Sequence, residues 1–317
     1  MPFFTIPGIL AGELAAFAVQ LCRLLLKILA VHILLACSST FAEAGVQLAN
    51  DDPVAAASPS VQWLQLEDGL DFHEFRPGGS GAKITVLRIV PEKFDFILKS
   101  AGEDGSVPKT LAEWAEEGGL AAAINASMYL PDGKTSTGYL RQKDYVNNPR
   151  IVGRFGAFFV AQPRRPGLPA ARIVDKDESG WKEVLEDYDL VIQNYRMTNS
   201  SRKILWSPGG PLYAISAVAQ DGDGRILFLH SSVPMEAYNF VQQILHLPLD
   251  ARTIMYVEGG AQAGMVVHSS GLKRDLGLPH APSFLVTGKL KAALPNILGI
   301  RARSLEHPDP SPGGQPE

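Results

Sequence analysis

The stretch MYVEGGAQAGM, residues 255–265, ends a short apolar segment on one carboxylate, Glu258, and follows it with Gly259 and Gly260. A tight turn between strands favours Asn-Gly or Asp-Gly, and a buried strand avoids an acid. A carboxylate at a strand end can act as a nucleophile or a base, and neighbouring glycines let a ligand approach the backbone. The alternative is an acid that only caps nearby backbone N–H groups.

Other polar side chains also follow apolar segments that we predict to be strands. Asn125 comes after AAAI, and Gln193 and Asn194 come after DLVI. Asn often closes a strand, so one such residue means little. Three strand ends that expose side chains at a common rim would form a site on a rigid scaffold, and this pattern favours a site.

Two polar stretches have residue types that suit a sugar or an anion. NYRMTNSSRK carries Arg196, Arg202 and Lys203, and a planar guanidinium matches phosphate oxygens. A solvated loop is the alternative for such a charge run. MYLPDGKTSTGYLR carries Tyr129 and Tyr139, a composition that suits either stacking on a sugar or a β-hairpin.

Several familiar functional motifs are excluded by their spacing. GGSG is neither a nucleophile elbow nor a phosphate loop, and DGDG indicates a hairpin turn rather than a calcium loop. The seven histidines form no i, i+4 pair or tight cluster, so we expect no metal site, and His230 is interpreted as a strand-end residue. We expect no cofactor. A net charge of -4 without a clustered basic face argues against nucleic acid.

Hydrophobic periodicity predicts strand pairs mixed with only a few helices. KITVLRIV and KFDFILKS are predicted as paired strands, with Phe94, Phe96 and Leu98 on one face of the second. Further strands are predicted at AAAIN, GAFFVA, DLVIQN, LYAISAVAQ, RILFLHS, TIMYV, MVVH and SFLVT. This pattern predicts an α+β fold, with mixed, largely antiparallel sheets and a few packed helices in a single domain.

Two segments are predicted to be helices. TLAEWAEEGG has Thr110 and Glu113 in capping-box spacing. SSVPMEAYNFVQQILHL has Ser232 as a candidate cap and Pro234 near its first turn.

The N-terminus has the order of a secretory signal. Arg23 and Lys27 precede the apolar run ILAVHILLAC and the small-residue segment SSTFAEA. Cleavage after AEA by an ordinary signal peptidase is slightly favoured, whereas LLAC resembles a lipobox that would place a lipid on Cys37. A membrane anchor is the alternative, weakened by the short run and by His32. We expect export to the periplasm or cell envelope, or secretion, with membrane contact only through the leader or that lipid.

The expected organisation is a leader at 1–44, a linker at 45–60, one domain at 61–290 and a tail at 291–317 whose Pro/Gly-rich end is disordered. The only cysteines, Cys22 and Cys37, lie in the leader. The expected mature domain therefore has no disulfide, and its only thiol would be a Cys37 that carries a lipid.

Three separated blocks together resemble the phosphodiester glycosidase family, over roughly Ile84 to Thr287. They are INASMYLPDGKTSTGY, VIQNYRM with SRK behind it, and MYVEGGAQAGM. Asn125, Gln193 and Arg202 match polar or basic positions of the family, and Glu258-Gly259-Gly260 falls on its Asp-Gly-Gly-Gly-Ser signature. The chain departs from that signature by Glu for Asp, Ala261 for Gly and Gln262 for Ser, and QNYR replaces the usual Gly-Pro after Gln. A bacterial branch with Tyr-Val-Glu-Gly-Gly looks nearer.

The resemblance implies hydrolysis of a glycosyl-1-phosphodiester bond in an envelope or extracellular glycan. A phosphate monoester leaves readily, so one carboxylate with cations on the phosphate would replace the usual pair of carboxylates. The implied roles are nucleophile or base for Glu258, phosphate binding for Arg202 and Arg196, orientation of sugar hydroxyls for Asn125 and Gln193, and cover of the ring for Tyr129 or Tyr139. The departures also suit a non-catalytic glycan-binding protein, and a glycosyl-phosphate transferase is a third possibility.

Overall fold

Alternating apolar side chains form three antiparallel sheets in a computed structural model that describes residues 61–303 except 80, 270, 283, 284, 286 and 287. The described residues all fall within one compact unit. The predicted leader, the linker and the end of the tail lie outside them. The α+β prediction, with largely antiparallel sheets and few helices, is confirmed.

The first sheet has the order β1 (Leu64–Glu67), β2 (Leu70–Phe75), β3 (Ile84–Ile89), β12 (Ile226–Met235), β11 (Tyr213–Asp221) and β13 (Ala251–Gly259). The second has the order β7 (Tyr145–Asn148), β6 (Leu140–Gln142), β10 (Tyr188–Asn194), β8 (Ala157–Pro163) and β9 (Ala171–Asp175). The third has the order β15 (Leu272–Asp275), β14 (Met265–Ser269), β5 (Ala122–Asn125), β16 (Asn296–Ala302) and β4 (Phe94–Ser100).

The three sheets share one apolar core. Phe96 of β4 lies 5.2 Å from Phe159 of β8 and 6.5 Å from Phe228 of β12, measured between ring centroids. Each of these rings is buried, and burying such a side chain stabilises the fold by roughly 1.5–3 kcal/mol. Phe94, Phe96 and Leu98 all enter this core, so their predicted common face is confirmed.

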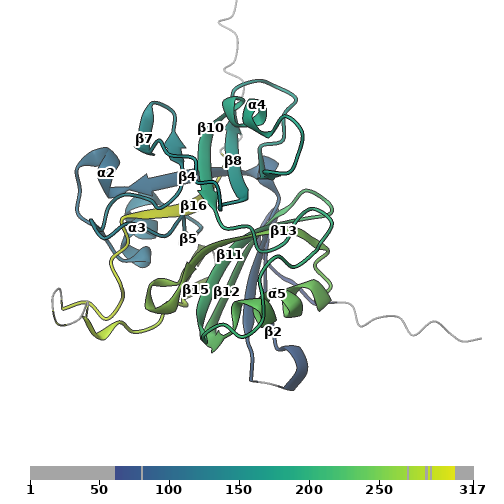
Figure 1. The fold of residues 1–317 in the computed structure, drawn as a ribbon. Coiled ribbons are helices and arrows are strands. Elements are labelled where there is room, and N and C mark those ends of the chain that lie inside the picture. The colour runs from purple at the N-terminus through teal and green to yellow at the C-terminus, as the bar shows by residue number, and fades with distance from the viewer. Residues whose placement is uncertain (1–60, 80, 270, 283–284, 286–287, 304–317) are drawn as a thin grey trace, which may run out of the picture. The chain divides into compact units, whose positions relative to one another are not determined.

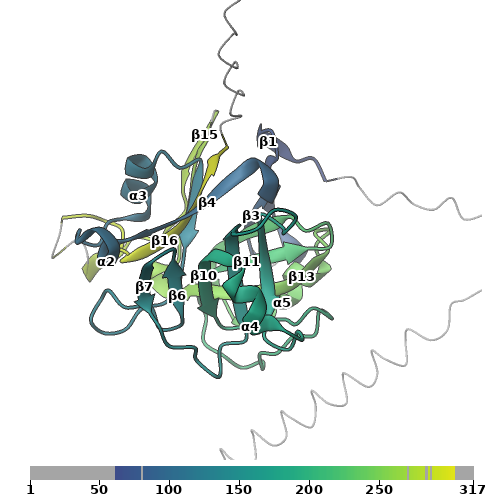
Figure 2. The same ribbon diagram turned by 90° about the horizontal axis from the view of Figure 1, so that it is seen from above.

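Short helices cover the outer faces of two sheets. Helix α5 (Ala237–His246) lies against β11 and β13, and buries Phe240, Val241 and Ile244 there (Figure 1). Helix α3 (Leu111–Gly118) packs beside β5 and β14 (Figure 2). The predicted capping box of α3 is confirmed, with the Glu113 N–H donating to Thr110 Oγ1 at 3.3 Å.

The remaining helical elements are short. Among the described residues they include α2 (Ala101–Asp104), α4 (Trp181–Glu186) and the 3-10 turns η1 (Pro77–Gly79), η2 (Pro91–Lys93) and η3 (Gly260–Gln262). No helix among the described residues is long and apolar enough to cross a membrane.

Three sequence-based expectations about elements are corrected. The first paired KITVLRIV with KFDFILKS, but β3 pairs with β2 and β12, and β4 pairs with β16, because long-range pairing overrides sequence proximity. The second began a helix at Ser232 and Pro234, which instead lie in β12; Pro234 is tolerated because it is near the strand end. The third concerns His230, which lies inside β12 rather than at its end.

The end of the chain also differs from the expected organisation. Strand β16 lies in the stretch expected to be a tail and occupies a place between β5 and β4. The ordered domain therefore extends past residue 290. The strand expected at SFLVT falls mostly on residues outside the described part.

Gly138 provides a test of the packing between the second sheet and the loop that precedes β6. A Cβ at Gly138 would overlap the backbone carbonyl oxygen of Gln193 and lie 2.9 Å from the Phe155 ring. We expect Gly138→Ala to lower the unfolding free energy by about 1–3 kcal/mol in urea denaturation, because the backbone must move.

Gly153→Ala is the matched control, since no atom lies within 4 Å of a Cβ at that position. Its effect should stay within about 0.5 kcal/mol. Equal effects of the two substitutions would contradict close packing at Gly138.

Candidate active site

Strand β13 presents Glu258 next to its C-terminal residue, where an irregularity in the pairing reorients the backbone. Glu258 is opposite Ser216 of β11, but Tyr256 is opposite Ala217, so Val257 is an extra residue on the β13 side. Such β-bulges re-aim side chains and are frequent beside active sites. The Glu258 side chain remains only 8 % exposed.

Asn125 holds the loop that follows Glu258. It is the last residue of β5, its Nδ2 donates to the Gln262 carbonyl at 3.0 Å, and its Oδ1 accepts from the Gly264 N–H at 2.9 Å. Asn125 is buried, so these two bonds fix the backbone of the loop on both sides of Ala263. The structure therefore brings Asn125 and the loop after Glu258 together, with Asn125 in a positioning role.

Gly259 is required for the packing of two tyrosines. A Cβ at Gly259 would overlap the hydroxyl oxygen of Tyr256 and lie 2.9 Å from the ring of Tyr213. The Gly259 N–H donates to Glu258 Oε1 at 2.9 Å. Gly260 adopts a φ of 74°, a left-handed conformation that glycine adopts without strain. The two glycines thus serve packing and chain direction at the carboxylate.

Burial raises the pKa of the Glu258 carboxyl to about 7, and the hydrogen bond from the Gly259 N–H only partly opposes that shift. Taking a carboxylate out of water disfavours its charged form, whereas a nearby guanidinium would favour it. No cation contributes to this shift. Glu258 is therefore an acid–base group that changes charge near neutral pH.

Tyr129 is the second predicted site residue that the structure places at Glu258. Burial raises the pKa of its hydroxyl, the charge of Glu258 adds to that shift, and a hydrogen bond with Gln262 opposes it. Tyr129 belongs to a hairpin-like turn in which it pairs with Ser136. A phenol that stays protonated at neutral pH is a hydrogen-bond donor beside the carboxyl.

Sequence reasoning missed three residues at this strand end. Burial raises the pKa of the Tyr256 hydroxyl, and the charge of Glu258 adds to that shift. Ser216 and His230 lie side by side with Glu258 across β13, β11 and β12. The signal available in the sequence was one polar residue inside each of two apolar stretches, Ser216 in LYAISAVAQ and His230 in RILFLHS, and only the sheet register shows that the two residues are neighbours.

Ser216 and His230 support the loop after Glu258. Ser216 Oγ lies 3.1 Å from His230 Nδ1 and 3.2 Å from the Gly264 carbonyl, and His230 Nε2 lies 3.0 Å from the Leu276 carbonyl. Burial lowers the pKa of His230 to about 4, so its ring is neutral at pH 7. A neutral ring that donates from Nε2 to the Leu276 carbonyl has an acceptor at Nδ1, so the single Ser216 hydroxyl proton is shared between Nδ1 and the Gly264 carbonyl.

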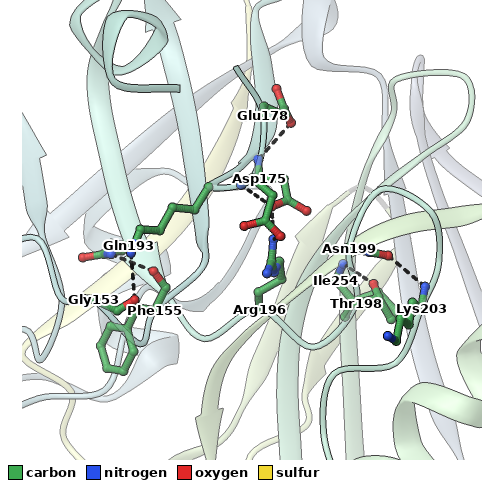
Figure 3. Close-up of polar contacts among 12 residues, drawn as sticks. Gly153, Phe155, Asp175, Glu178, Gln193, Arg196, Thr198, Asn199, Lys203 and Ile254 are labelled. Carbon is green, nitrogen blue, oxygen red and sulfur yellow. Dashed lines mark hydrogen bonds and ion pairs between the residues drawn. The ribbon is translucent and has the colours of Figure 1, made fainter. Parts of the chain in front are cut away.

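The side-chain amides of Gln193 and Asn194 form hydrogen bonds with backbone groups. The Gln193 amide accepts from Tyr139 and Val152 and donates to the Val152 and Phe155 carbonyls, and Figure 3 shows it turned toward Phe155. Asn194 donates to the Ala126 carbonyl at 2.9 Å. Both side chains are fully buried. They tie β10 to neighbouring loops, and the structure does not present them to a ligand.

The arginines predicted to bind phosphate are engaged elsewhere. Arg196 points at Asp175, with which it forms an ion pair, and lies 2.7 Å from Asp177 (Figure 3). Arg202 donates to the Leu245 carbonyl at 2.8 Å and lies 3.3 Å from Asp250. Asp250 precedes β13, so Arg202 sits about 25 Å along the strand from Glu258. The structure brings neither guanidinium to the carboxyl.

Tyr139 is also separated from Glu258. It packs with Phe158 and Trp181 in an apolar cluster of the second sheet. Of the residues predicted from the sequence, the described structure therefore assembles Glu258, Gly259, Gly260, Asn125 and Tyr129 at one place. No group of three or more His, Cys, Asp or Glu residues within the described ranges is arranged to hold a metal ion.

A buried acid with a near-neutral pKa, held on a clamped loop beside protonated tyrosines, is the kind of site found in hydrolases. The family model for phosphodiester glycosidases matches residues 118–301, more than half of the chain. The chain belongs to the phosphodiester glycosidase family. No curated protein matches it.

Solved structures of low sequence identity share the fold. A hypothetical protein from Synechocystis matches with a TM-score of 0.53 and 12% identity, covering 78% of this chain and 65% of that one. The catalytic domain of zebrafish N-acetylglucosamine-1-phosphodiester alpha-N-acetylglucosaminidase, auto-inhibited by its pro-peptide, matches with a TM-score of 0.51 and 11% identity, covering 78% of this chain and 85% of that one. This chain thus spans just under two thirds of the Synechocystis protein.

The raised pKa of Glu258 predicts a pH-dependent stability difference. Between its ordinary value of 4.5 and about 7 the unfolded chain releases this proton while the folded chain keeps it, so folding loses stability as pH rises. We expect Glu258→Gln to gain about 3 kcal/mol of unfolding free energy relative to the wild type between pH 4 and pH 8.

Urea denaturation of both proteins across that pH range measures the difference. The contribution of His230, whose lowered pKa destabilises the fold as pH falls from 6.5 toward 4, is present in both proteins and cancels. A difference that does not change with pH would contradict a buried, protonated Glu258.

Proposed function

We propose that the protein hydrolyses a glycosyl-1-phosphodiester bond, with Glu258 taking a proton from the water that attacks the anomeric carbon. The observation that carries this proposal is the pKa of about 7 of a carboxyl that is 8 % exposed. A general base is most effective when its pKa lies near the working pH. Family membership supports the bond type.

The chemistry of the leaving group explains how one carboxyl suffices. Cleavage between the anomeric carbon and the phosphate oxygen releases a phosphate monoester, which needs no strong acid to leave. Glu258 receives the proton of the water as the new carbon–oxygen bond forms. The clamp by Asn125 fixes the loop beside the carboxyl, and a misplaced catalytic group lowers rates steeply.

Of the two tyrosines beside Glu258, Tyr129 supplies a hydrogen-bond donor, whereas the Tyr256 hydroxyl donates to Tyr213. Burial raises the pKa of both Tyr129 and Tyr256, so their hydroxyls are protonated at neutral pH. A neutral phenol donates to a phosphate or sugar oxygen without lowering the pKa of the adjacent carboxyl as a guanidinium would. We assign Tyr129 to substrate binding, and we leave Arg196 and Arg202 out of the site because aspartates already pair with them.

The leader-like N-terminus supports export, and an envelope or extracellular glycan is the proposed source of the substrate. The order of charged, apolar and small residues in the first 44 residues carries this part of the proposal.

Substitution of Glu258 tests the catalytic role. We expect Glu258→Gln to fold and bind substrate but to lose turnover of sugar 1-(aryl phosphate) diesters by about a hundredfold or more, since an amide accepts no proton from water. Glu258→Asp should keep a small part of the activity because its reach is shorter. The wild-type kcat/KM should rise with pH, reach half of its maximum near pH 7 and level off above it.

Arg202→Ala is the comparison variant, since its ion pair lies at the other end of β13. We expect its turnover to remain within about twofold of the wild type, as for a surface ion pair. Near wild-type turnover of Glu258→Gln would end the catalytic role, and absence of turnover in the wild type would favour a glycan-binding protein. A strong loss in Arg202→Ala would restore its predicted phosphate role.

Intact-mass spectrometry of the protein from its native envelope tests export. We expect a mature chain that starts near Gly45 or at a lipid-bearing Cys37, because a signal peptide is removed during translocation. An intact chain from Met1 through Ala44 would contradict a cleaved leader and favour an N-terminal anchor.

A further inference from the structure

An aromatic row extends from the neighbourhood of Glu258 toward a separate pocket. Tyr256 lies 5.3 Å from Trp206, Trp206 lies 5.9 Å from Tyr195, and Tyr195 lies 4.2 Å from Phe155, measured between ring centroids. A cavity of about 520 Å³ opens at the far part of this row. It is lined by Arg154, Gly156, Tyr195, Arg196, Leu205 and Trp206.

The two arginines of the pocket differ in charge balance. Arg196 is paired with two carboxylates, those of Asp175 and Asp177, so its guanidinium is already engaged and the three groups together carry one negative charge. Arg154 is exposed, forms no ion pair with any residue in the described ranges, and lies with its guanidinium carbon 5.6 Å from the Tyr195 ring centre. The lining of the pocket therefore includes one guanidinium, that of Arg154, without a carboxylate partner among the described residues, beside the rings of Tyr195 and Trp206.

We propose that this pocket is a second saccharide subsite that binds an anionic sugar residue of the glycan cleaved at Glu258. Aromatic faces pack on the C–H faces of a sugar ring, and Tyr195 and Trp206 provide such faces with Leu205 beside them. The Arg154 guanidinium forms charged hydrogen bonds with the carboxylate or phosphate of that sugar. A volume of this size suits a small ligand with a few polar anchors.

The position of the pocket defines the class of substrate, and in this respect the inference rests on the proposed function. The Tyr256 N–H donates to the Tyr195 carbonyl at 3.0 Å, and the buried Tyr256 ring packs against Trp206, so the pocket lies beside the part of β13 that leads to Glu258. A glycan chain that occupies the cleavage site extends over this short distance to the pocket. The substrate is then an acidic glycan with at least one charged sugar besides the phosphodiester, rather than a free sugar phosphate.

Ligand-observed NMR titration of the full chain tests the subsite with three probes: glucuronic acid, glucose 6-phosphate and glucose. We expect the wild type to bind at least one anionic probe more tightly than glucose. Arg154→Ala should weaken that binding by about tenfold or more and leave glucose unchanged, because only the charged hydrogen bonds are lost. Preference for glucuronic acid or for glucose 6-phosphate tells which anion the natural sugar carries.

Arg301→Ala is the matched control. Arg301 is also exposed and forms no ion pair among the described residues, but it lies near the end of β16 away from Ile297, the residue that pairs with Asn125. The Arg301→Ala variant should bind all three probes as the wild type does. Equal losses in Arg154→Ala and Arg301→Ala, or equal binding of all probes by the wild type, would overturn the subsite.

Glu258→Gln separates this inference from the proposed reaction. The variant should bind the anionic probe as the wild type does, because the subsite lies beyond Tyr256 and Trp206. If this variant no longer binds the anionic probe, the probe binds at the cleavage site, and this result would contradict a second subsite. If Glu258→Gln keeps full turnover and Arg154→Ala still loses binding of the probe, the second subsite is supported and the proposed catalytic role of Glu258 is contradicted.

Discussion

The two hydrogen bonds of the Asn125 side chain are the constraint on which the site depends. They join the end of β5, in the third sheet, to the loop that leaves β13 of the first sheet. Without this bridge the buried Gly264 N–H would be left unpaired, which costs about 1–3 kcal/mol, and the half-buried Gln262 carbonyl would also lose its partner. The Ser216–His230 pair supports the same loop from β11 and β12.

The burial of Glu258 follows from this clamp. The fixed loop, the packed tyrosines and the missing side chain at Gly259 exclude water from the carboxyl. A charged carboxylate there is disfavoured, so the pKa rises toward neutrality and the fold loses stability above that pH. A strained or destabilised acid is a common feature of active sites, where function opposes stability.

Several features that depend on neighbours in the sequence were predicted correctly, whereas strand partners that depend on contacts between distant segments were not. The capping box of α3, the common face of Phe94, Phe96 and Leu98, and the DGDG turn between β11 and β12 depend on neighbours in sequence. The partners of β3 and β4 depend on contacts between distant segments, which periodicity does not encode. Glu258, Asn125 and Tyr129 lie in distinctive blocks, and the structure brings them together. The distance of Arg202 from Glu258 could not be predicted, because a charged loop has no register.

The separation of the arginines from Glu258 matters for the chemistry. If Arg196 or Arg202 lay beside the carboxyl, its charge would lower the pKa and weaken Glu258 as a base. The structure instead pairs both arginines with aspartates. The proposed phosphodiester substrate would add a negative charge near the buried acid, and a like charge would raise its pKa further. In the proposed reaction Tyr129, as a neutral donor, holds that phosphate without reversing the effect, so the substrate would strengthen the base proposed to act on it.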